Sequence, residues 1–305
     1  MLSALTGSVE LGLLYAIMAL GVYITFRILD FPDLTVDGSF TTGGAIASVM
    51  IAGGGSPSLA TVTAFIGGLA AGAITGPLHT KGRINALLSG ILMMIALYSV
   101  NLRIMEKKAN ISLLGVDTLL SNISLLVVMP FVVLVIKFAL DWFLHTDLGM
   151  ALRATGDNPR MIRSFGVNTH STIIVGISLS NGLVAMSGAL IAQYQGFADI
   201  TMGIGMIVIG LASVIIGEAL FGARTVIRAT LAVVLGAIIY RLVVALAIRI
   251  GLEPTDMKLM TALIVIVALT LPMIRGSLRQ KATVRKRAAE LEVASVSKLS
   301  SGGER

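Results

Sequence analysis

Long apolar runs dominate this sequence and limit the folds open to it. A helix that crosses a bilayer needs about 20 mainly apolar residues. We identify candidate spans at 9–29, 38–54, 59–78, 84–104, 124–144, 170–194, 203–222, 226–249 and 258–275. The second is short, rich in glycine and preceded by Asp33 and Asp37, so we expect a broken or partly re-entrant helix there. The predicted fold is an all-α polytopic membrane protein with about nine transmembrane helices.

The composition agrees with this class and excludes several others. Only 13% of the residues are charged, whereas soluble domains average about 25%. There is no cysteine, which excludes disulfides and thiolate metal sites. The histidines, His79, His145 and His170, have no metal-ligand spacing, so no metal site is expected. The net charge of +7 comes mostly from residues at span ends and in the tail, which indicates control of topology, not binding to nucleic acid.

The positions of the basic residues also predict how the chain is oriented. If the C-terminus is cytoplasmic, the inside set is Arg27, Lys81, Arg83, Arg153, Arg160, Arg163, Arg224, Arg228 and the basic residues from Arg275 onward. The outside set is Arg103, Lys107, Lys108, Arg249 and Lys258. Inside residues prevail by about three to one, which predicts an outside N-terminus and a cytoplasmic C-terminus in a bacterial inner membrane.

The two ends of the chain carry no further predicted span. No Lys or Arg precedes the first apolar run, so we do not expect a cleaved signal peptide. Residues 276–305 form a basic and then serine-rich cytoplasmic tail. We expect this tail to lie partly on anionic lipid and to be partly disordered.

Two stretches of the sequence indicate an internal repeat. "FPDLTVDGSFTTGGAIAS" begins at Phe31 and "FADITMGIGMIVIGLAS" begins at Phe197, and each follows a long span and opens a glycine-containing one. The predicted topology inverts the two copies, and inverted repeats with broken helices are typical of transporters. The alternative is that Asp33 and Asp199 only cap helices. We predict a first repeat at 1–110, an extracytoplasmic loop and linking span at 111–147, and a second repeat at 169–275.

The stretch at 148–168 is polar and rich in arginine, although it lies between two apolar spans. It reads "LGMALRATGDNPRMIRSFGVN" and lies on the predicted cytoplasmic side. It resembles the cytoplasmic loop of permease subunits of ATP-binding-cassette (ABC) importers of the branched-chain amino acid/ribose type. The positions that match this family are Gly149, Ala151, Leu152, Arg153, Ala154, Gly156, Asn158, Gly166, Val167 and Asn168. The later run "GLASVIIGEALFGARTVIRATLAVVLGAIIY" also resembles the family.

The resemblance implies a fold and a role for this stretch. The fold would be that of a type II importer permease, similar to the cobalamin importer permease, with the first helix absent. Region 148–168 would hold the coupling helix, which docks on the ATPase and transmits its closure to the spans. The alternative is an amphipathic surface helix. Gly156, Asp157, Asn158 and Pro159 supply a turn and a helix start, with proline at an allowed first-turn position. The candidate ATPase-coupling residues of region 148–168 are Arg153, Ala154, Thr155, Gly156, Asp157, Asn158, Pro159, Arg160 and Arg163.

The partners follow partly from what the sequence lacks. No G-x-x-x-x-G-K-[ST] motif occurs, so ATP and Mg²⁺ are expected on a separate ATPase subunit, with no cofactor and no catalysis in this chain. The chain also has no large extracytoplasmic domain, so a separate solute-binding protein is implied. The family and the two-fold symmetry common in oligomers predict a second permease copy, so we expect a homodimer.

Ionisable and polar residues within spans are candidates for the translocation pathway, because burying them in lipid is costly. Arg241 can meet a carboxylate of the solute, snorkel, or pair with Asp199 or Glu253. For Glu218 we expect a partner in Arg224 or Arg228, and Lys137 either snorkels or pairs with Asp141. The candidate pathway residues are Asp33, Thr35, Asp37, Ser39, Thr41, Thr42, Asn181, Asp199, Thr201 and Arg241.

The predicted function is the permease subunit of an ABC importer for a small polar solute. Glu218 stands where the family usually has glycine, and "DLTVDGSFTTGGA" is more acidic than the usual motif. The acidic motif resembles that of an uncharacterised subgroup associated with uptake of aromatic amino acids and similar small solutes. The alternatives are an ion-coupled secondary transporter with inverted repeats, which needs midplane carboxylates, the permease of an ABC exporter, and a membrane scaffold or receptor that transports nothing.

Overall fold

A computed structural model describes residues 2–121, 125–249, 259–267 and 270, and these residues fold mainly into helices. The elements are α1 (Leu2–Tyr23), the π-helical turn η1 (Ile24–Ile28), α2 (Thr35–Ala52), α3 (Pro57–Thr80), α4 (Ala86–Ile104), β1 (Asn110–Ser112), α5 (Leu125–Leu144), α6 (Asp147–Asp157), α7 (Pro159–Ser164), α8 (Thr169–Gln195), β2 (Phe197–Asp199), α9 (Met206–Phe221) and α10 (Val226–Arg249).

Six helices of the described chain are long and apolar enough to cross a membrane. They are Leu5–Ile28, Pro57–Thr80, Ala86–Ile104, Leu125–Leu144, Thr169–Gln195 and Val226–Arg249. The second and seventh predicted spans form the shorter helices α2, of 18 residues, and α9, of 16 residues. The ninth is helical over 259–267, while its remainder and the tail from 276 lie outside the described residues. The chain is a multi-pass membrane protein, and the count of nine remains a prediction.

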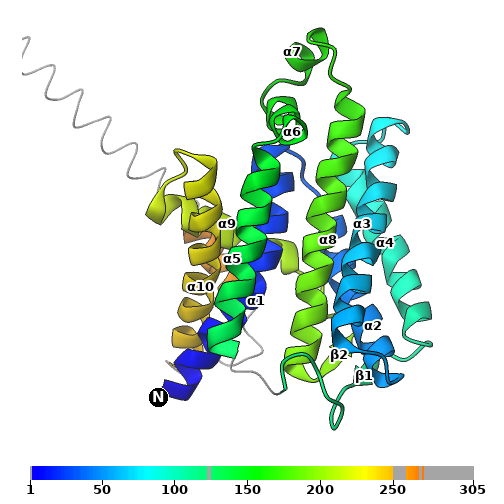
Figure 1. The fold of residues 1–305 in the computed structure, drawn as a ribbon, viewed down its shortest axis with the longest axis vertical. Coiled ribbons are helices and arrows are strands. Elements are labelled where there is room, and N and C mark those ends of the chain that lie inside the picture. The colour runs from blue at the N-terminus through cyan, green and yellow to red at the C-terminus, as the bar shows by residue number, and fades with distance from the viewer. Residues whose placement is uncertain (1, 122–124, 250–258, 268–269, 271–305) are drawn as a thin grey trace, which may run out of the picture.

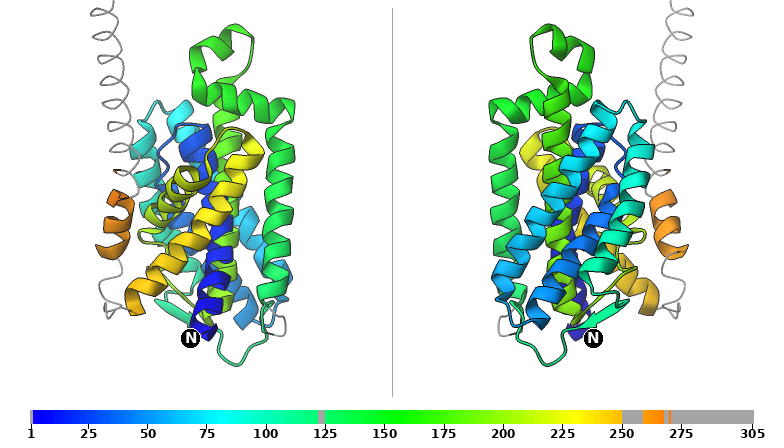
Figure 2. Two further views of the ribbon diagram at one scale, coloured as in Figure 1. Left: turned by 90° about the vertical axis from the view of Figure 1, so that its left-hand side faces the viewer. Right: turned by 90° about the vertical axis from the view of Figure 1, so that its right-hand side faces the viewer.

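The long helices run side by side along one axis, and the connections gather at its two ends (Figure 1). One end carries the N-terminus and a small sheet in which β1 pairs antiparallel with β2, with Asn110 opposite Asp199. The other end carries α6 and α7. There α6 lies across the bundle from the end of α5, and α7 projects beyond it (Figure 2).

The bundle is held together by close approach of α8 to its neighbours. A Cβ atom on Gly43 of α2 would overlap the backbone oxygen of Ala185, and one on Gly188 of α8 would overlap that of Phe40. Glycine at both positions therefore lets the two backbones touch, as is common where helices associate in lipid. Most of α1 is also buried, so α1 and α8 form the centre around which the other helices pack.

Candidate functional site

The N-termini of the two short apolar helices, α2 and α9, meet inside the bundle. Asp37 lies in the first turn of α2, and its carboxylate accepts hydrogen bonds from the backbone N–H groups of Gly205 (2.8 Å) and Ile207 (2.8 Å). One turn on, the Thr41 hydroxyl accepts from the N–H of Gly203 at 3.1 Å. A carboxylate at a helix start satisfies N–H groups that have no partner in the helix and interacts favourably with its dipole. Asp37 thus joins the starts of both helices.

A cavity of about 300 Å³ opens beside this junction. Its polar groups come from Asp37, Thr41 and Asn101, and its remaining wall is mostly apolar. The lining residues are Asp37, Gly38, Thr41, Met94, Ile95, Tyr98, Asn101, Ile200 and Ile204. Asn101 is fixed in place, because its side chain accepts from the Thr42 hydroxyl (2.8 Å) and donates to the Gly38 carbonyl (3.2 Å). A mainly apolar pocket with a few oriented polar groups is the usual form of a small-molecule site.

A second group of polar residues lies buried between α2, α3 and α8 and does not line this cavity. Asp33 accepts from the N–H of Thr35 (2.9 Å) and from the side-chain amide of Asn181 (2.7 Å). Asn181 in turn accepts from the Ser39 hydroxyl at 2.7 Å, and Thr35 shares a hydrogen bond of 3.1 Å with Thr75. These groups bond mainly to one another, so their geometry is that of a network that holds α2, α3 and α8 together.

The predicted pathway residues therefore separate into distinct places. Asp37 and Thr41 line the cavity, and Thr42 orients its Asn101 wall. Asp33, Thr35, Ser39 and Asn181 belong to the buried network. Asp199 and Thr201 lie at the sheet end of the bundle, where the Thr201 N–H donates to Asp199 at 2.7 Å. The sequence reasoning missed the α4 wall of the cavity, although Asn101 is a polar residue within an apolar run and marks it.

Arg241 lies apart from all of these residues, on α10. Its guanidinium carbon is 4.0 Å from the centre of the Tyr15 ring of α1, which is a cation–π geometry. Within the described residues, the Nε–H of Arg241 is buried and finds no acceptor. No ion pair with Asp199 is present in the described part of the chain.

The element at the other end of the bundle is built from two short helices with a sharp bend between them. Thr146 caps α6 by accepting from the N–H of Gly149 (3.3 Å). Asn158 ends α6 in an extended conformation and caps α7 by accepting from the N–H of Met161 (3.0 Å). Pro159 occupies the first turn of α7, where its missing N–H costs nothing. The predicted turn and helix start at 156–159 thus form, but as the boundary between two helices.

One face of this element packs on the bundle. A Cβ atom on Gly156 would overlap the carbonyl oxygen of Ile28, so α6 lies directly against η1 at the end of α1. Thr155 is buried and shares a hydrogen bond of 3.0 Å with Thr172 of α8. Arg163 donates from Nε to the Thr169 hydroxyl at 2.7 Å, which ties α7 back to the start of α8. These contacts connect α6 and α7 to α1 and α8.

The opposite side of the element formed by α6 and α7 is exposed. No residue of α7 is buried, and the side chains of Met161 and Phe165 are 50% and 74% exposed. Arg160 is exposed beside them. Because α7 projects away from the bundle (Figure 1), it presents two large apolar side chains and a guanidinium to its surroundings.

Comparison with known proteins places this architecture in a family. The family model described as "Branched-chain amino acid transport system / permease component" matches residues 5–270. The chain belongs to this family of permease components. It is thus the permease component of an ABC transport system.

The permease is also similar to individual known proteins. It is 45% identical over 269 residues to a tyrosine transport system permease protein of Clostridioides difficile (strain R20291), covering 88% of this chain and 91% of that one. It is 35% identical over 280 residues to an uncharacterized protein of Rickettsia prowazekii (strain Madrid E), covering 88% and 98%. A solved inward-facing structure of a metal-chelate type ABC transporter aligns with 90% of this chain and 85% of its own, at 17% identity and a TM-score of 0.49.

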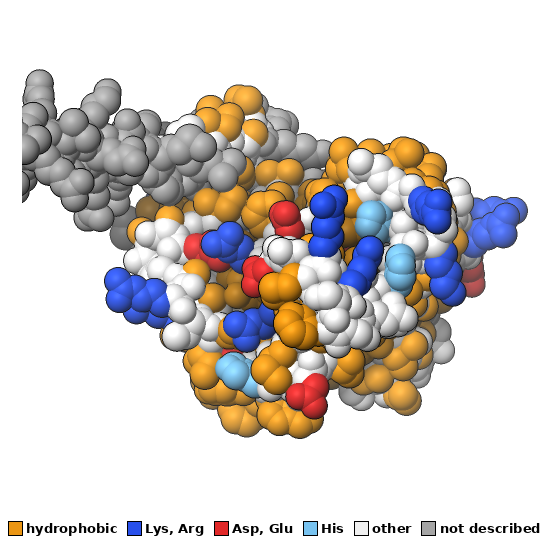
Figure 3. All heavy atoms as spheres, turned by 90° about the horizontal axis from the view of Figure 1, so that it is seen from above, with side chains coloured by type: hydrophobic (Ala, Val, Ile, Leu, Met, Phe, Trp, Pro, Cys, Tyr) orange, Lys and Arg blue, Asp and Glu red, His pale blue; other side chains and the backbone are white. Residues whose placement is uncertain are grey.

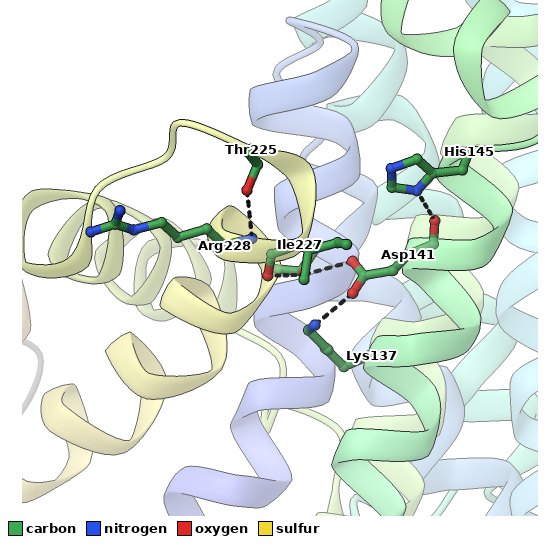
Figure 4. A network of polar contacts seen from close by, with 7 residues as sticks. Lys137, Asp141, His145, Thr225, Ile227 and Arg228 are labelled. Atoms are coloured by element: carbon green, nitrogen blue, oxygen red, sulfur yellow. Dashed lines mark hydrogen bonds and ion pairs between the residues drawn. The ribbon is translucent and has the colours of Figure 1, made fainter.

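Two ion pairs connect helices of the permease near the end that carries α6. Lys137 and Asp141 of α5 are almost fully buried, and the Nζ of Lys137 lies 2.6 Å from the Oδ2 of Asp141. Of the two alternatives predicted for Lys137, the structure therefore confirms the ion pair. Asp141 also accepts from the Thr230 hydroxyl of α10 at 2.7 Å, so the pair links α5 to α10 (Figure 4). Glu218 of α9 pairs with Arg27 of η1 at 3.0 Å. The prediction that Glu218 pairs with Arg224 or Arg228 was wrong. Arg228 donates instead to the carbonyl of Phe221.

Proposed function

We propose that this chain is the permease subunit of an ABC importer for an amino acid, with aromatic amino acids as the first candidates. The similarity to a tyrosine transport permease supports this substrate class. So does the cavity beside Asp37, because a volume of about 300 Å³ suits a molecule of amino acid size. Its carboxylate, hydroxyl and amide groups suit an ammonium group, and its wall of Met94, Ile95 and Tyr98 suits an aromatic side chain.

The observation that carries the transport mechanism is the meeting of α2 and α9 at Asp37. The two helices start together and run to opposite ends of the bundle, α2 toward the sheet and α9 toward the Arg27–Glu218 pair. Their likeness at 31–48 and 197–213 supports the inverted repeat, which we retain as a proposal. In such folds the solute passes at the repeat interface, and access alternates as one half moves against the other.

The exposed side of α7 supports docking of an ATPase. Met161 and Phe165 are large apolar side chains on a projecting helix, and such unpartnered groups mark protein contacts. The other side of the element contacts Ile28 at the end of α1 and Thr172 of α8. A displacement of α7 would therefore be transmitted to α1 and α8. We assign the binding of ATP and Mg²⁺ to that ATPase, and none to this chain.

The remaining parts of the assembly follow from the same assignment. The permease would act as a dimer of identical chains in a bacterial inner membrane, with its N-terminus outside and its C-terminus in the cytoplasm. A separate extracytoplasmic protein would deliver the solute to the end that carries the β1–β2 sheet. We also propose nine membrane helices of the type II importer arrangement, counting α2, α9 and the segment that includes 259–267.

Co-purification with the ATPase encoded beside it tests this proposal. The variant Met161→Asp with Phe165→Asp places charges on the exposed side of α7 and should lose the ATPase. Leu114→Asp is the matched control, because Leu114 is 83% exposed but lies near the sheet end. Substitution of Gly156 is unsuitable, since any side chain there would displace α6 from Ile28.

The outcomes separate the candidate functions. Retention of ATPase by the native chain and by Leu114→Asp, together with its loss from the α7 variant, supports the importer assignment. ATP-dependent uptake of radiolabelled tyrosine into proteoliposomes would then establish direction and substrate. If the native chain never retains an ATPase, the proposal fails and an ion-coupled transporter takes its place.

A further inference from the structure

A polar hollow of about 340 Å³ lies beneath α6, separate from the cavity beside Asp37. Its walls come from the end of α1 with η1, from α6, from the end of α9 and from the start of α10. The lining residues are Tyr23, Arg27, Ile28, Arg153, Asp157, Glu218, Ala223, Arg224, Thr225, Val226 and Ala229. It opens toward the end of the molecule that carries α6, where basic and acidic side chains gather (Figure 3).

The charges around the hollow do not cancel. Three guanidinium groups, from Arg27, Arg153 and Arg224, face two carboxylates, from Asp157 and Glu218. Glu218 is occupied by the Nε–H of Arg27 at 3.0 Å. In the part of the chain that the structure describes, Arg153 and Arg224 have neither an ion pair nor a hydrogen bond. Two arginines with free donors therefore border one small space.

We propose that this hollow binds an oxyanion group, a carboxylate or a phosphate, from the cytoplasmic side. Guanidinium groups bind both through paired, charge-assisted hydrogen bonds, and arginine is the residue best shaped for this purpose. The volume admits a free ion, a small carboxylate solute or the headgroup of a lipid. The cytoplasmic location rests on the orientation given under the proposed function, whereas the chemistry of the hollow does not.

An ion bound there would connect α6, η1 and the connection between α9 and α10. Arg153 comes from α6, Arg27 from η1 and Arg224 from the connection between α9 and α10. An oxyanion shared by these groups would fix α6, the helix that precedes the proposed ATPase contact on α7, to the ends of α1 and α9. Binding should raise the thermal stability of the permease, because a ligand that binds only the folded state stabilises it increasingly as its concentration exceeds the dissociation constant.

The test is thermal unfolding of the full-length permease, without an ATPase, in nanodiscs of phosphatidylcholine. The probes are inorganic phosphate, tyrosine and tyrosinamide, which lacks the carboxylate, each compared with chloride at equal ionic strength. We expect phosphate to raise the melting temperature, and tyrosine to raise it more than tyrosinamide, which can bind only beside Asp37. Arg153→Gln and Arg224→Gln should each weaken the apparent affinity about tenfold or more.

Matched variants and lipids keep the test decisive. Arg160→Gln removes an exposed arginine of α7 outside the hollow and should leave the affinity unchanged. If Arg153→Gln does not fold, Arg224→Gln on the exposed α9–α10 connection decides alone. Nanodiscs that contain phosphatidylglycerol identify the source: a native chain already stabilised there through Arg153 and Arg224, and insensitive to added phosphate, holds a lipid headgroup.

The proposal is overturned if neither the soluble probes nor phosphatidylglycerol stabilise the native chain more than the two variants. It is also overturned if phosphate stabilises the native chain and both variants equally, since the ion then binds elsewhere. Either result leaves the co-purification experiment unaffected, because no ATPase is present. Conversely, a chain that never retains an ATPase can still bind an oxyanion in this hollow.

Discussion

Asp33 and Asp199 make the same local hydrogen bond in very different surroundings. Each carboxylate accepts from the N–H group two residues later, that of Thr35 (2.9 Å) or Thr201 (2.7 Å). Asp33 is 2% exposed and its second oxygen holds Asn181 of α8, whereas Asp199 is half-buried and bonds only to Thr201. One sequence pattern therefore builds a core network in one half and a surface turn in the other. Burial, not residue identity, should set how much each contributes to stability.

The largest loss of stability is expected when the buried ion pair between Lys137 and Asp141 is broken. Lys137→Met should lower the free energy of unfolding by about 3–5 kcal/mol, because it leaves the charge of Asp141 buried without a partner. The Lys137 and Asp141 side chains are only 3% and 7% exposed. Unfolding in a detergent mixture of increasing denaturant content measures the difference.

Two further variants show whether burial is the cause. Lys137→Met with Asp141→Leu should recover most of the loss, since no buried charge remains. Arg27→Gln should cost at most about 1 kcal/mol, because the Arg27 side chain is 58% exposed. Equal losses for Lys137→Met and Arg27→Gln would contradict the argument from burial.

Asp33→Ala is expected to have the next largest effect. It removes the acceptor for the N–H of Thr35 and for one amide hydrogen of Asn181, and each buried donor left unpaired costs about 1–3 kcal/mol. The same denaturation experiment applies. Asp33→Asn keeps one acceptor oxygen and should lose less; a larger loss for Asn than for Ala would show that the network needs no acceptor at this position.

The sequence was sufficient to predict the elements that depend on local pattern. Apolar runs of about 20 residues predicted the long helices, and Asn158 followed by Pro159 predicted the start of α7. The likeness of the two Asp-Thr turns was also visible. These features depend on residues close together in the chain.

Contacts between distant segments were not predictable in the same way. The partner of Glu218 proved to be Arg27, 191 positions away, while the nearer arginines were expected. Likewise, Asp37 reaches Gly205 and Asn101 reaches Thr42 only because α2, α4 and α9 pack together. Sequence spacing gives no measure of such approaches. The polar residues from Asp33 to Thr42 were therefore predicted together as pathway residues, although the fold divides them between a cavity and a core network.

Asp37→Ala tests a contact of the first repeat copy that has no counterpart beside Asp199 in the second copy. It leaves the N–H groups of Gly205 and Ile207 without their cap, for which we expect a loss of about 1–2 kcal/mol in unfolding free energy. Transport should fall further than stability does, because the same carboxylate lines the cavity. Asp117→Ala, at an exposed carboxylate near the sheet end, is the matched control. Unchanged uptake by a folded Asp37→Ala chain would exclude this cavity from the pathway.

Asp199→Ala should have the smallest effect of the series. Both of its hydrogen bonds go to Thr201, at a position where water can replace the lost acceptor, so the expected loss is below about 1 kcal/mol. Measured beside Asp33→Ala under identical conditions, it gives the direct comparison of the two turns. A loss as large as that of Asp33→Ala would mean that the pairing of Asp199 with Asn110 in the β1–β2 sheet depends on this turn. The two copies would then contribute equally to stability, one through the core and the other through the sheet.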